Sequence, residues 1–189
     1  MKKPLILFLA LVVFAASLLY FEFPWTVLGP VFLKDTVNTY SRKYGVDPLL
    51  VIAVIKAESN FSKSAKSSTG AAGLMQLMPS TAEEVAKALN FTDYKPSDLE
   101  NPDINIQFGV YYLAELRKEF RNNNVLALAA YNAGKSKVQI WYKKNPMLEV
   151  EISDIPYDET RRYVKTVMRN YKWLKWIQNL RNLIRKKTP

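Results

Sequence analysis

One acidic residue opens the stretch of the chain whose residue types and spacing best suit chemistry, "ESNFSKSAKSSTGAAGLMQLMPST" at 58–81. After Glu58, no other carboxylate follows until Glu83. The chain of 189 residues contains no Cys and no His, which excludes Ser-His-Asp catalysis, Cys nucleophiles, and metal sites built from thiolates or imidazoles. Any catalysis must therefore rest on carboxylates, Lys, Tyr or hydroxyl groups.

Glu58 closes an apolar run, "LLVIAVIKAE", that predicts a buried helix. It shares one helical face with the apolar residues Leu50, Val51, Val54 and Ile55. We expect that position to remove water from the carboxyl and raise its pKa, which would keep a proton available for general acid catalysis near neutral pH. The alternative is a solvated glutamate at a helix end, followed by a flexible loop. Spacing alone does not identify a substrate.

The segment after Glu58 predicts a polar loop. Residues 59–80 carry seven Ser or Thr hydroxyls and no acid. Gly70 and Gly73 bracket Ala71-Ala72, and because glycine has no Cβ, we expect the backbone to approach a ligand closely there.

Several capping signals mark the helices that must position this loop. Asp47-Pro48 and Asn101-Pro102 each place a capping side chain before a proline suited to the first helical position. Ser80 and Thr81 stand three residues before two glutamates, which predicts capping boxes for a helix that continues to about residue 89.

Hydrophobic periodicity completes the fold prediction. Apolar residues recur every three or four positions over 104–120, a short helix should end at Gly134, and a long final helix should span about 158–185. The only short strand candidate is "LEVEIS" at 148–153. The sequence therefore predicts an all-α, or nearly all-α, single domain.

The first 33 residues predict a membrane or export segment. Lys2 and Lys3 precede the uncharged, apolar run 4–21, which is the orientation signal for a short cytoplasmic N-terminus. We favour a retained anchor helix over a cleaved signal peptide, for which Ala15-Ala16-Ser17 is the candidate site. Residues 34–189 would then form the exported domain.

The net charge of +10 and the isoelectric point near 9.6 favour anionic surroundings. The export signal and the dispersed basic residues argue against nucleic acid as a partner. An apolar stripe near the C-terminus, surrounded by Lys and Arg, allows two interpretations: it packs on the domain, which we favour, or it lies on an anionic membrane. The stripe consists of Trp173, Ile177, Leu180 and Ile184.

Three stretches together resemble the motifs of the soluble-type lytic transglycosylases, a family of lysozyme-like fold. They are the segment 58–81, "AAYNAG" at 129–134 and "IPYDETRRYV" at 155–164, which stand in the family's order. The resemblance covers about residues 35–175 and leaves no motif position unmatched.

The resemblance implies non-hydrolytic cleavage of the β-1,4 bond between N-acetylmuramic acid and N-acetylglucosamine in peptidoglycan. In this family one glutamate acts first as acid and then as base, and the muramoyl C6 hydroxyl attacks C1 to form a 1,6-anhydro end. The usual pair of carboxylates is then unnecessary. The alternatives are a hydrolytic muramidase of the same fold and a non-catalytic cell-wall glycan-binding protein.

The same resemblance implies roles for individual residues. Glu58 matches the catalytic acid and base. Leu74 and Met75 are expected in the core, and Glu159 is either a supporting residue or an ordinary acid at a helix N-terminus. The expected substrate-binding or supporting residues are Ser67, Gln76, Met78, Tyr131, Asn132, Glu159 and Tyr163.

The expected setting follows from the resemblance and the N-terminal segment together. We expect no metal and no cofactor. The predicted partners are peptidoglycan glycan strands and, through the N-terminal helix, the cytoplasmic membrane, and we expect a monomer. The predicted location is the bacterial cell envelope, either anchored to the outer face of the cytoplasmic membrane or secreted.

Overall fold

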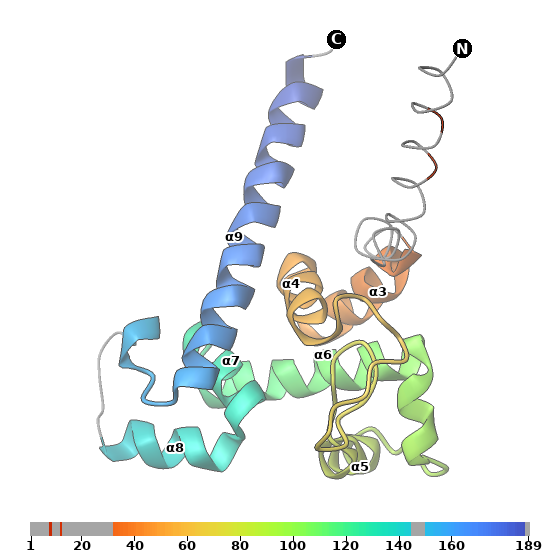
Figure 1. Cartoon of the computed structure of the whole chain (residues 1–189), viewed down its shortest axis with the longest axis vertical. Helices are drawn as coiled ribbons and strands as arrows, with labels where there is room; N and C mark the ends of the chain where they lie inside the picture. Colours follow the sequence, from red (N-terminus) through yellow and green to blue (C-terminus); the bar gives the residue numbers. More distant parts are fainter. Residues whose placement is uncertain (1–7, 9–11, 13–31, 145–149, 188–189) are drawn as a thin grey trace.

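The described part of the chain is almost entirely helical in the computed structural model, which describes Phe8, Val12, 32–144 and 150–187 (Figure 1). Within these residues no β-strand forms, and only isolated bridges join Lys66 to Ala72 and Ala72 to Leu77. The predicted all-α class is confirmed. The elements in chain order are α3 Lys34–Tyr44, α4 Pro48–Ser59, α5 Pro79–Ala88, the 3₁₀ helix η1 Pro96–Glu100, α6 Pro102–Glu119, α7 Asn124–Ala133, α8 Lys135–Lys144, the 3₁₀ helix η2 Ile152–Asp154 and α9 Asp158–Lys187.

Two of the predicted helix starts form as expected. The Asp47 side chain accepts a hydrogen bond of 2.8 Å from the backbone N–H of Leu49 at the start of α4. Asn101 accepts one of 2.9 Å from the N–H of Asp103 at the start of α6. In both helices a proline occupies the first turn, where a missing N–H costs nothing. Gly134, with φ of 92°, ends α7 as predicted.

The predicted capping boxes at Ser80 and Thr81 are wrong. The helix α5 begins one residue earlier, at Pro79, with Met78 in the capping position and no side-chain cap. Proline suits the first helical position, so the helix begins at Pro79. Ser80 and Thr81 therefore lie within the first turn, where they cannot act as its N-cap.

The strand candidate at 148–153 is also wrong over its described part. Residues 148 and 149 lie outside the described residues, and Ile152–Asp154 forms η2. The Asp154 carboxylate accepts a hydrogen bond of 2.8 Å from the N–H of Glu151, and this local bond favours a turn over an extended strand. The helix α8 was not predicted.

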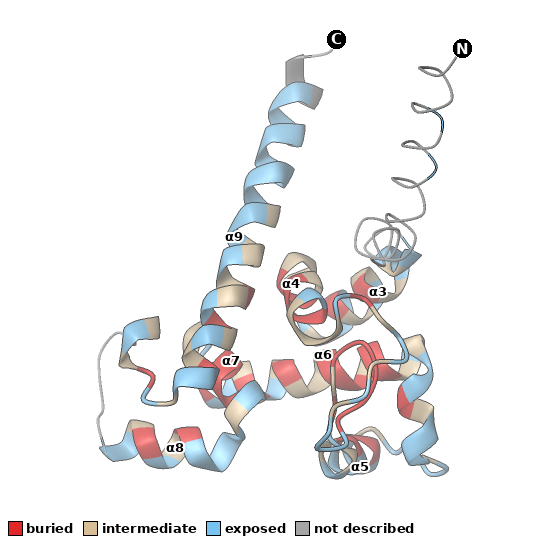
Figure 2. Cartoon of the chain, in the orientation of Figure 1, coloured by how far each residue is buried: buried red, intermediate tan, exposed pale blue. Residues whose placement is uncertain are grey.

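The core lies where α4 meets its neighbours. Helix α9 packs against α4 and α7, and α6 packs against α3 and α7. Figure 2 shows the buried residues gathered on α4, α6, α7 and the first half of α9. Helix α4 exposes none of its apolar side chains and fully buries Leu50, Val51, Ala53, Val54 and Ile55, in keeping with its apolar sequence.

The C-terminal half of α9 departs from the favoured interpretation, since it does not pack on the domain. From Lys172 to Ile184 every residue except Leu174 is exposed, and Trp173 keeps 56% of its surface in solvent. Helix α9 has 30 residues and α4 has 12. The two run antiparallel, since Tyr163 near the start of α9 lies beside Glu58 at the end of α4, and Tyr171 bonds to Asp47 at the start of α4. The last turns of α9 therefore extend past the start of α4 and leave the body of the domain (Figure 2).

The predicted N-terminal anchor at 4–21 lies outside the described residues, apart from Phe8 and Val12. Among the residues that the structure describes, no helix combines the length and apolar character needed to cross a membrane. The division of the chain at residues 33 and 34 stays a prediction.

Candidate active site

Glu58 lies in the last turn of α4, where it is half-buried. Burial raises the pKa of its carboxyl from 4.5 to about 7, and interaction with the Tyr163 hydroxyl lowers it by a smaller amount. No other carboxylate of the described residues contributes to the shift. The predicted desolvation of Glu58 is therefore confirmed, and its cause is the apolar packing around α4.

Tyr163 reaches Glu58 from the beginning of α9. The antiparallel packing of α9 on α4 brings the start of α9 beside the end of α4. The Tyr163 hydroxyl is buried and lies beside the Glu58 carboxyl, but it does not reach the geometry of a full hydrogen bond to any described residue. Its pKa is raised well above 10.0 by burial and by the charge of Glu58, so it stays protonated and can donate.

Tyr131 approaches the same carboxyl from α7. Its hydroxyl donates a hydrogen bond of 2.8 Å to the backbone carbonyl of Met75 in the loop after Glu58. Its pKa is raised well above 10.0, first by burial and then by the charge of Glu58. The three sequence motifs, distant in the chain, thus each supply one residue to a single place in the fold.

The loop that follows Glu58 is fixed by polar residues that the sequence motifs did not single out. The Ser59 hydroxyl donates to the carbonyls of Ile55, at 3.1 Å, and Leu74, at 2.8 Å. These bonds join the end of α4 to the far side of the loop. The local signal was present, because Ser59 directly follows the candidate acid, but its partner is fifteen residues away.

Asn105 is the other residue that sequence reasoning missed. It is fully buried in α6, where its Oδ1 accepts from the N–H of Met75 at 2.8 Å and its Nδ2 donates to the carbonyls of Ala72 and Leu99, both at 2.9 Å. A lone polar residue on the buried face of an apolar helix was the available signal. Such a residue must satisfy its polar groups inside the protein.

Gly73 serves a purpose different from the predicted one. Its φ is 78°, and a Cβ at this position would collide with the Asn105 side chain and the Leu99 carbonyl. The close approach that glycine permits here is to α6 and η1, not to a ligand. Leu74 and Met75 next to it are buried, as predicted.

Gln76 also turns toward the protein. Its Nε2 donates to the carbonyls of Ala65 and Gly73, each at 2.9 Å, and its φ is 45°. These two bonds hold the loop in a closed turn, so the described contacts of Gln76 are structural.

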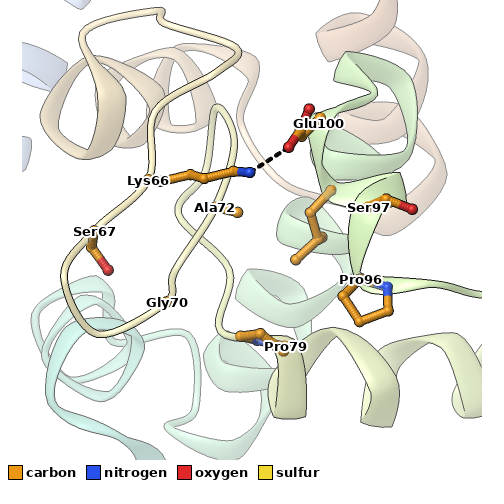
Figure 3. Close-up of a pocket in the computed structure, with 9 residues that line it drawn as sticks. Lys66, Ser67, Gly70, Ala72, Pro79, Pro96, Ser97 and Glu100 are labelled. Carbon is orange, nitrogen blue, oxygen red and sulfur yellow. Dashed lines mark ion pairs between the residues drawn. The ribbon is translucent and has the colours of Figure 1, made fainter.

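Ser67 lies at the edge of a cavity of about 400 Å³ on the loop (Figure 3). Its Oγ accepts from the N–H of Ala71 at 2.9 Å and lies 2.9 Å from the Thr69 hydroxyl. Glu58 is not among the residues that line this cavity. The lining residues are Lys66, Ser67, Gly70, Ala72, Pro79, Pro96, Ser97, Leu99 and Glu100.

Three further predicted residues are exposed. Met78 keeps 39% of its surface in solvent, Asn132 lies near the end of α7, and Glu159 lies in the first turn of α9. The position of Glu159 fits the alternative of an ordinary acid favoured by the helix dipole. No cluster of acidic side chains in the described residues has the size to hold a metal ion.

This geometry supplies one carboxyl that is close to half-protonated at neutral pH, with two phenol hydroxyls around it. Such a group can both donate and accept a proton in one reaction cycle. The described residues show no second carboxylate that would act with it.

Known proteins match this chain over most of its helical region. The family model described as Transglycosylase SLT domain matches residues 35–152, which include Glu58 and Tyr131 and end before Tyr163. A soluble lytic murein transglycosylase of Salmonella typhimurium is 36% identical over 144 residues, covering 74% of this chain and 22% of that protein. A membrane-bound lytic murein transglycosylase E of Buchnera aphidicola is 34% identical over 120 residues, covering 59% of this chain and 54% of that protein.

Solved structures give the same result for the fold. An inactive mutant of the lytic transglycosylase Slt from Pseudomonas aeruginosa superposes with a TM-score of 0.72 at 36% identity, covering 77% of this chain and 24% of that one. The 70 kDa soluble lytic transglycosylase of Escherichia coli gives 0.72 at 31% identity, with the same coverage. The chain therefore spans about a quarter of the length of these soluble relatives.

Proposed function

The chain belongs to the transglycosylase SLT domain family, and we propose that it is a peptidoglycan lytic transglycosylase. In this proposal it cleaves the β-1,4 bond between N-acetylmuramic acid and N-acetylglucosamine and leaves a 1,6-anhydromuramoyl end. One observation carries the proposal: a single carboxyl, Glu58, has a pKa of about 7, and no second carboxylate among the described residues contributes to it.

Glu58 would act twice in each cycle. Its protonated form donates to the glycosidic oxygen as the bond to muramoyl C1 breaks, and the N-acetylglucosamine chain leaves as an alcohol. The resulting carboxylate then takes the proton of the muramoyl C6 hydroxyl as that oxygen bonds to C1. The proton count balances, Glu58 returns to its starting state, and no water is consumed. Because the nucleophile belongs to the substrate, its effective concentration at C1 is high.

The pKa of Glu58 suits this double use. A carboxyl with a pKa near the working pH is protonated often enough to donate and is a strong enough base to accept afterwards. The Tyr163 hydroxyl lies beside the carboxyl and is not fully hydrogen-bonded by described residues, so it can stabilise the carboxylate formed midway. Tyr131 would position the loop through its bond to the Met75 carbonyl.

The remaining residues stay in supporting roles in this proposal. Ser67 and Met78 would contact the glycan. The side-chain amide of Asn132 can both donate and accept hydrogen bonds, so it would bind an N-acetyl group of the glycan. Gln76 would act by shaping the loop, which its two carbonyl bonds favour. Glu159 would influence the site only from a distance.

Digestion of purified peptidoglycan in water enriched in heavy oxygen tests the reaction. We expect the new muramoyl ends to be unlabelled and lighter by one water than hydrolysed ends. The Glu58→Gln variant, treated in the same way, gives the background. Substantial heavy oxygen at the new reducing ends would show a hydrolytic muramidase of the same fold instead. Glycan binding without any new ends would show a non-catalytic binding protein.

The N-terminal segment completes the proposal. We propose that the lysine-flanked run 4–21 is retained as an anchor that holds the domain on the outer face of the cytoplasmic membrane. Full-length protein should then stay in the membrane fraction, with its catalytic domain open to external protease. A soluble mature form that begins near Leu18 would show a cleaved signal peptide.

A further inference from the structure

Helix α9 leaves the body of the domain near its middle. The Tyr171 hydroxyl donates a hydrogen bond of 2.7 Å to Asp47 Oδ2, and Lys175 Nζ lies 3.5 Å from the same oxygen. Asp47 caps the start of α4, so these contacts mark the point where α4 stops covering α9. Leu174 is the last residue of α9 that packs against the core. Beyond it the helix extends away from the domain (Figure 1).

The extending part presents a continuous apolar face, which we call the distal stripe. At 100° per residue, its side chains fall within an arc of about 120° on one side of the helix. All are exposed, with between 36% and 61% of their surface in solvent. The stripe consists of Trp173, Trp176, Ile177, Leu180 and Leu183.

The charged residues that accompany the distal stripe are all cationic. Lys172 and Arg181 lie on opposite flanks of it, and three further basic residues follow at 185–187 in the sequence. After Glu159 the chain contains no acidic residue. If the polar face of this helix only kept it in water, acidic residues would serve as well as basic ones. The pattern is that of a surface built for an anionic partner.

We propose that the distal stripe docks on an anionic membrane surface. Its apolar residues would lie at the boundary of headgroups and acyl chains, and the flanking Lys and Arg would contact lipid phosphates. The two tryptophans suit that boundary, because an indole combines a large apolar ring with a polar N–H. The inference does not depend on the catalytic proposal.

Other occupants satisfy only part of the pattern. A second copy of the stripe would bring like charges together, since neither helix offers an acid after residue 159. The apolar run 4–21 of the same chain could cover the stripe, but it supplies no negative charge for the flanks and is preceded by two lysines. An anionic polymer would match the charges but would leave the aliphatic residues Ile177, Leu180 and Leu183 in water. An anionic lipid surface satisfies the stripe and its flanks together.

Docking would also position the active site. Tyr163 lies on the same rigid helix as Leu180, 17 residues earlier, which is about 25 Å along the axis at 1.5 Å per residue. Glu58 would therefore be held at a fixed distance from the lipid contact. The stripe would then fix the orientation of the active site relative to the lipid surface.

The absence of cysteine from the chain allows a direct test on the full-length protein. Leu180→Cys places a single spin label on the distal stripe, and Asn182→Cys places a matched label on the opposite face of the same turn. Each variant is reconstituted into vesicles of phosphatidylcholine, with or without phosphatidylglycerol. The accessibility of each label to a neutral, water-soluble relaxation agent and to oxygen is then measured.

We expect the label at 180 to become several-fold less accessible to the water-soluble agent in vesicles with phosphatidylglycerol, and more accessible to oxygen. The label at 182 should stay exposed to water in both vesicles. In phosphatidylcholine alone, the label at 180 should also be exposed. Replacing both Lys172 and Arg181 by Gln in one variant should reduce the shielding of the label at 180. The substitution Asn179→Gln should leave that shielding unchanged.

Three results would overturn the proposal. Water exposure of the label at 180 in both kinds of vesicle would show that the stripe does not dock on lipid. Equal shielding in both would show that another part of the chain covers it. Shielding that rises with protein concentration and not with anionic lipid would show a second copy on the stripe.

Discussion

The two halves of α9, 158–171 and 172–187, share an apolar periodicity but lie in opposite surroundings. Both halves carry Lys and Arg together with apolar residues at helical spacing. In the first half, Val164 and Val167 are fully buried against α4 and α7. In the second half, Trp176 and Leu183 each keep about 60% of their surface in solvent. The difference in burial arises because α4 is shorter than α9, since the apolar periodicity continues through both halves.

This comparison separates two tasks within one helix. The packed half holds Tyr163 beside Glu58, so its apolar residues serve the geometry of the active site. The exposed half contributes nothing to that packing, so the distal stripe can serve a surface role. Periodicity indicates which face of a helix is apolar, but the length of the neighbouring helix decides whether that face is covered.

The largest expected effect falls on the packed side, at Glu58. Glu58→Gln keeps the size of the side chain and removes its proton, so we expect loss of nearly all turnover on purified peptidoglycan while folding and glycan binding remain. Glu159→Gln is the control, because Glu159 is exposed at the start of α9, and it should lower the rate only partly without changing the product. Release of anhydromuropeptides by Glu58→Gln at the parent rate would remove Glu58 from its role.

The same variant should change stability in a pH-dependent way. Burial holds the Glu58 proton in the native state up to about pH 7, whereas the unfolded chain releases it near 4.5. Between these values the native state binds more protons, so the free energy of unfolding falls as the pH rises. Above pH 7 the cost of burying the ionised Glu58 carboxylate is fully present. At about 1.4 kcal/mol per pH unit, this cost is about 3 kcal/mol.

Glu58→Gln removes this penalty. Denaturant unfolding at pH 8 should therefore show the variant to be more stable than the parent, by an amount that approaches about 3 kcal/mol. At pH 4 the two proteins should differ little, because both then carry a neutral side chain. An equal difference at both pH values would mean that the effect does not come from the proton of Glu58.

A pair of truncations in α9 compares the two halves directly. Val167→Ala removes two buried methyl groups and should lower the free energy of unfolding by about 2 kcal/mol. Leu180→Ala removes more atoms from an exposed position and should change it by no more than about 0.5 kcal/mol in the absence of lipid. Denaturant unfolding of both variants measures the contrast, and a large loss for Leu180→Ala would show that the distal half is covered in the free protein.

The sequence predicted those features whose cause is local or whose motif is long. The caps at Asp47 and Asn101 form because a side chain bonds to a backbone N–H two residues away. The meeting of Glu58 with Tyr131 and Tyr163 was implied by three motifs in a known order, not by spacing within the chain. By contrast, Ser80 and Thr81 showed a capping signal that the neighbouring Pro79 overrode.

The features that the sequence did not reveal depend on partners far along the chain. Asn105 stabilises the loop through carbonyls 6 and 33 residues away, and no short pattern shows such a pairing. Gly73 was assigned to ligand approach, but its neighbours turned out to be α6 and η1. The exposure of the distal stripe follows from the relative lengths of α4 and α9 in space, which is a property of packing and not of periodicity.

The smallest expected effect is at Tyr163, where the packed half of α9 meets the carboxyl. Its hydroxyl lowers the pKa of Glu58 without forming a full hydrogen bond, so Tyr163→Phe should raise that pKa. The rate of a general acid falls as it loses its proton, so the falling limb of kcat/KM should move to higher pH. Turnover should also decrease, because the carboxylate formed midway loses a donor. Tyr171→Phe, in the same helix but bonded to Asp47, is the matched control and should leave the pH profile in place. If both variants lower the rate without moving the limb, Tyr163 supports the packing of α9 and does not act on Glu58.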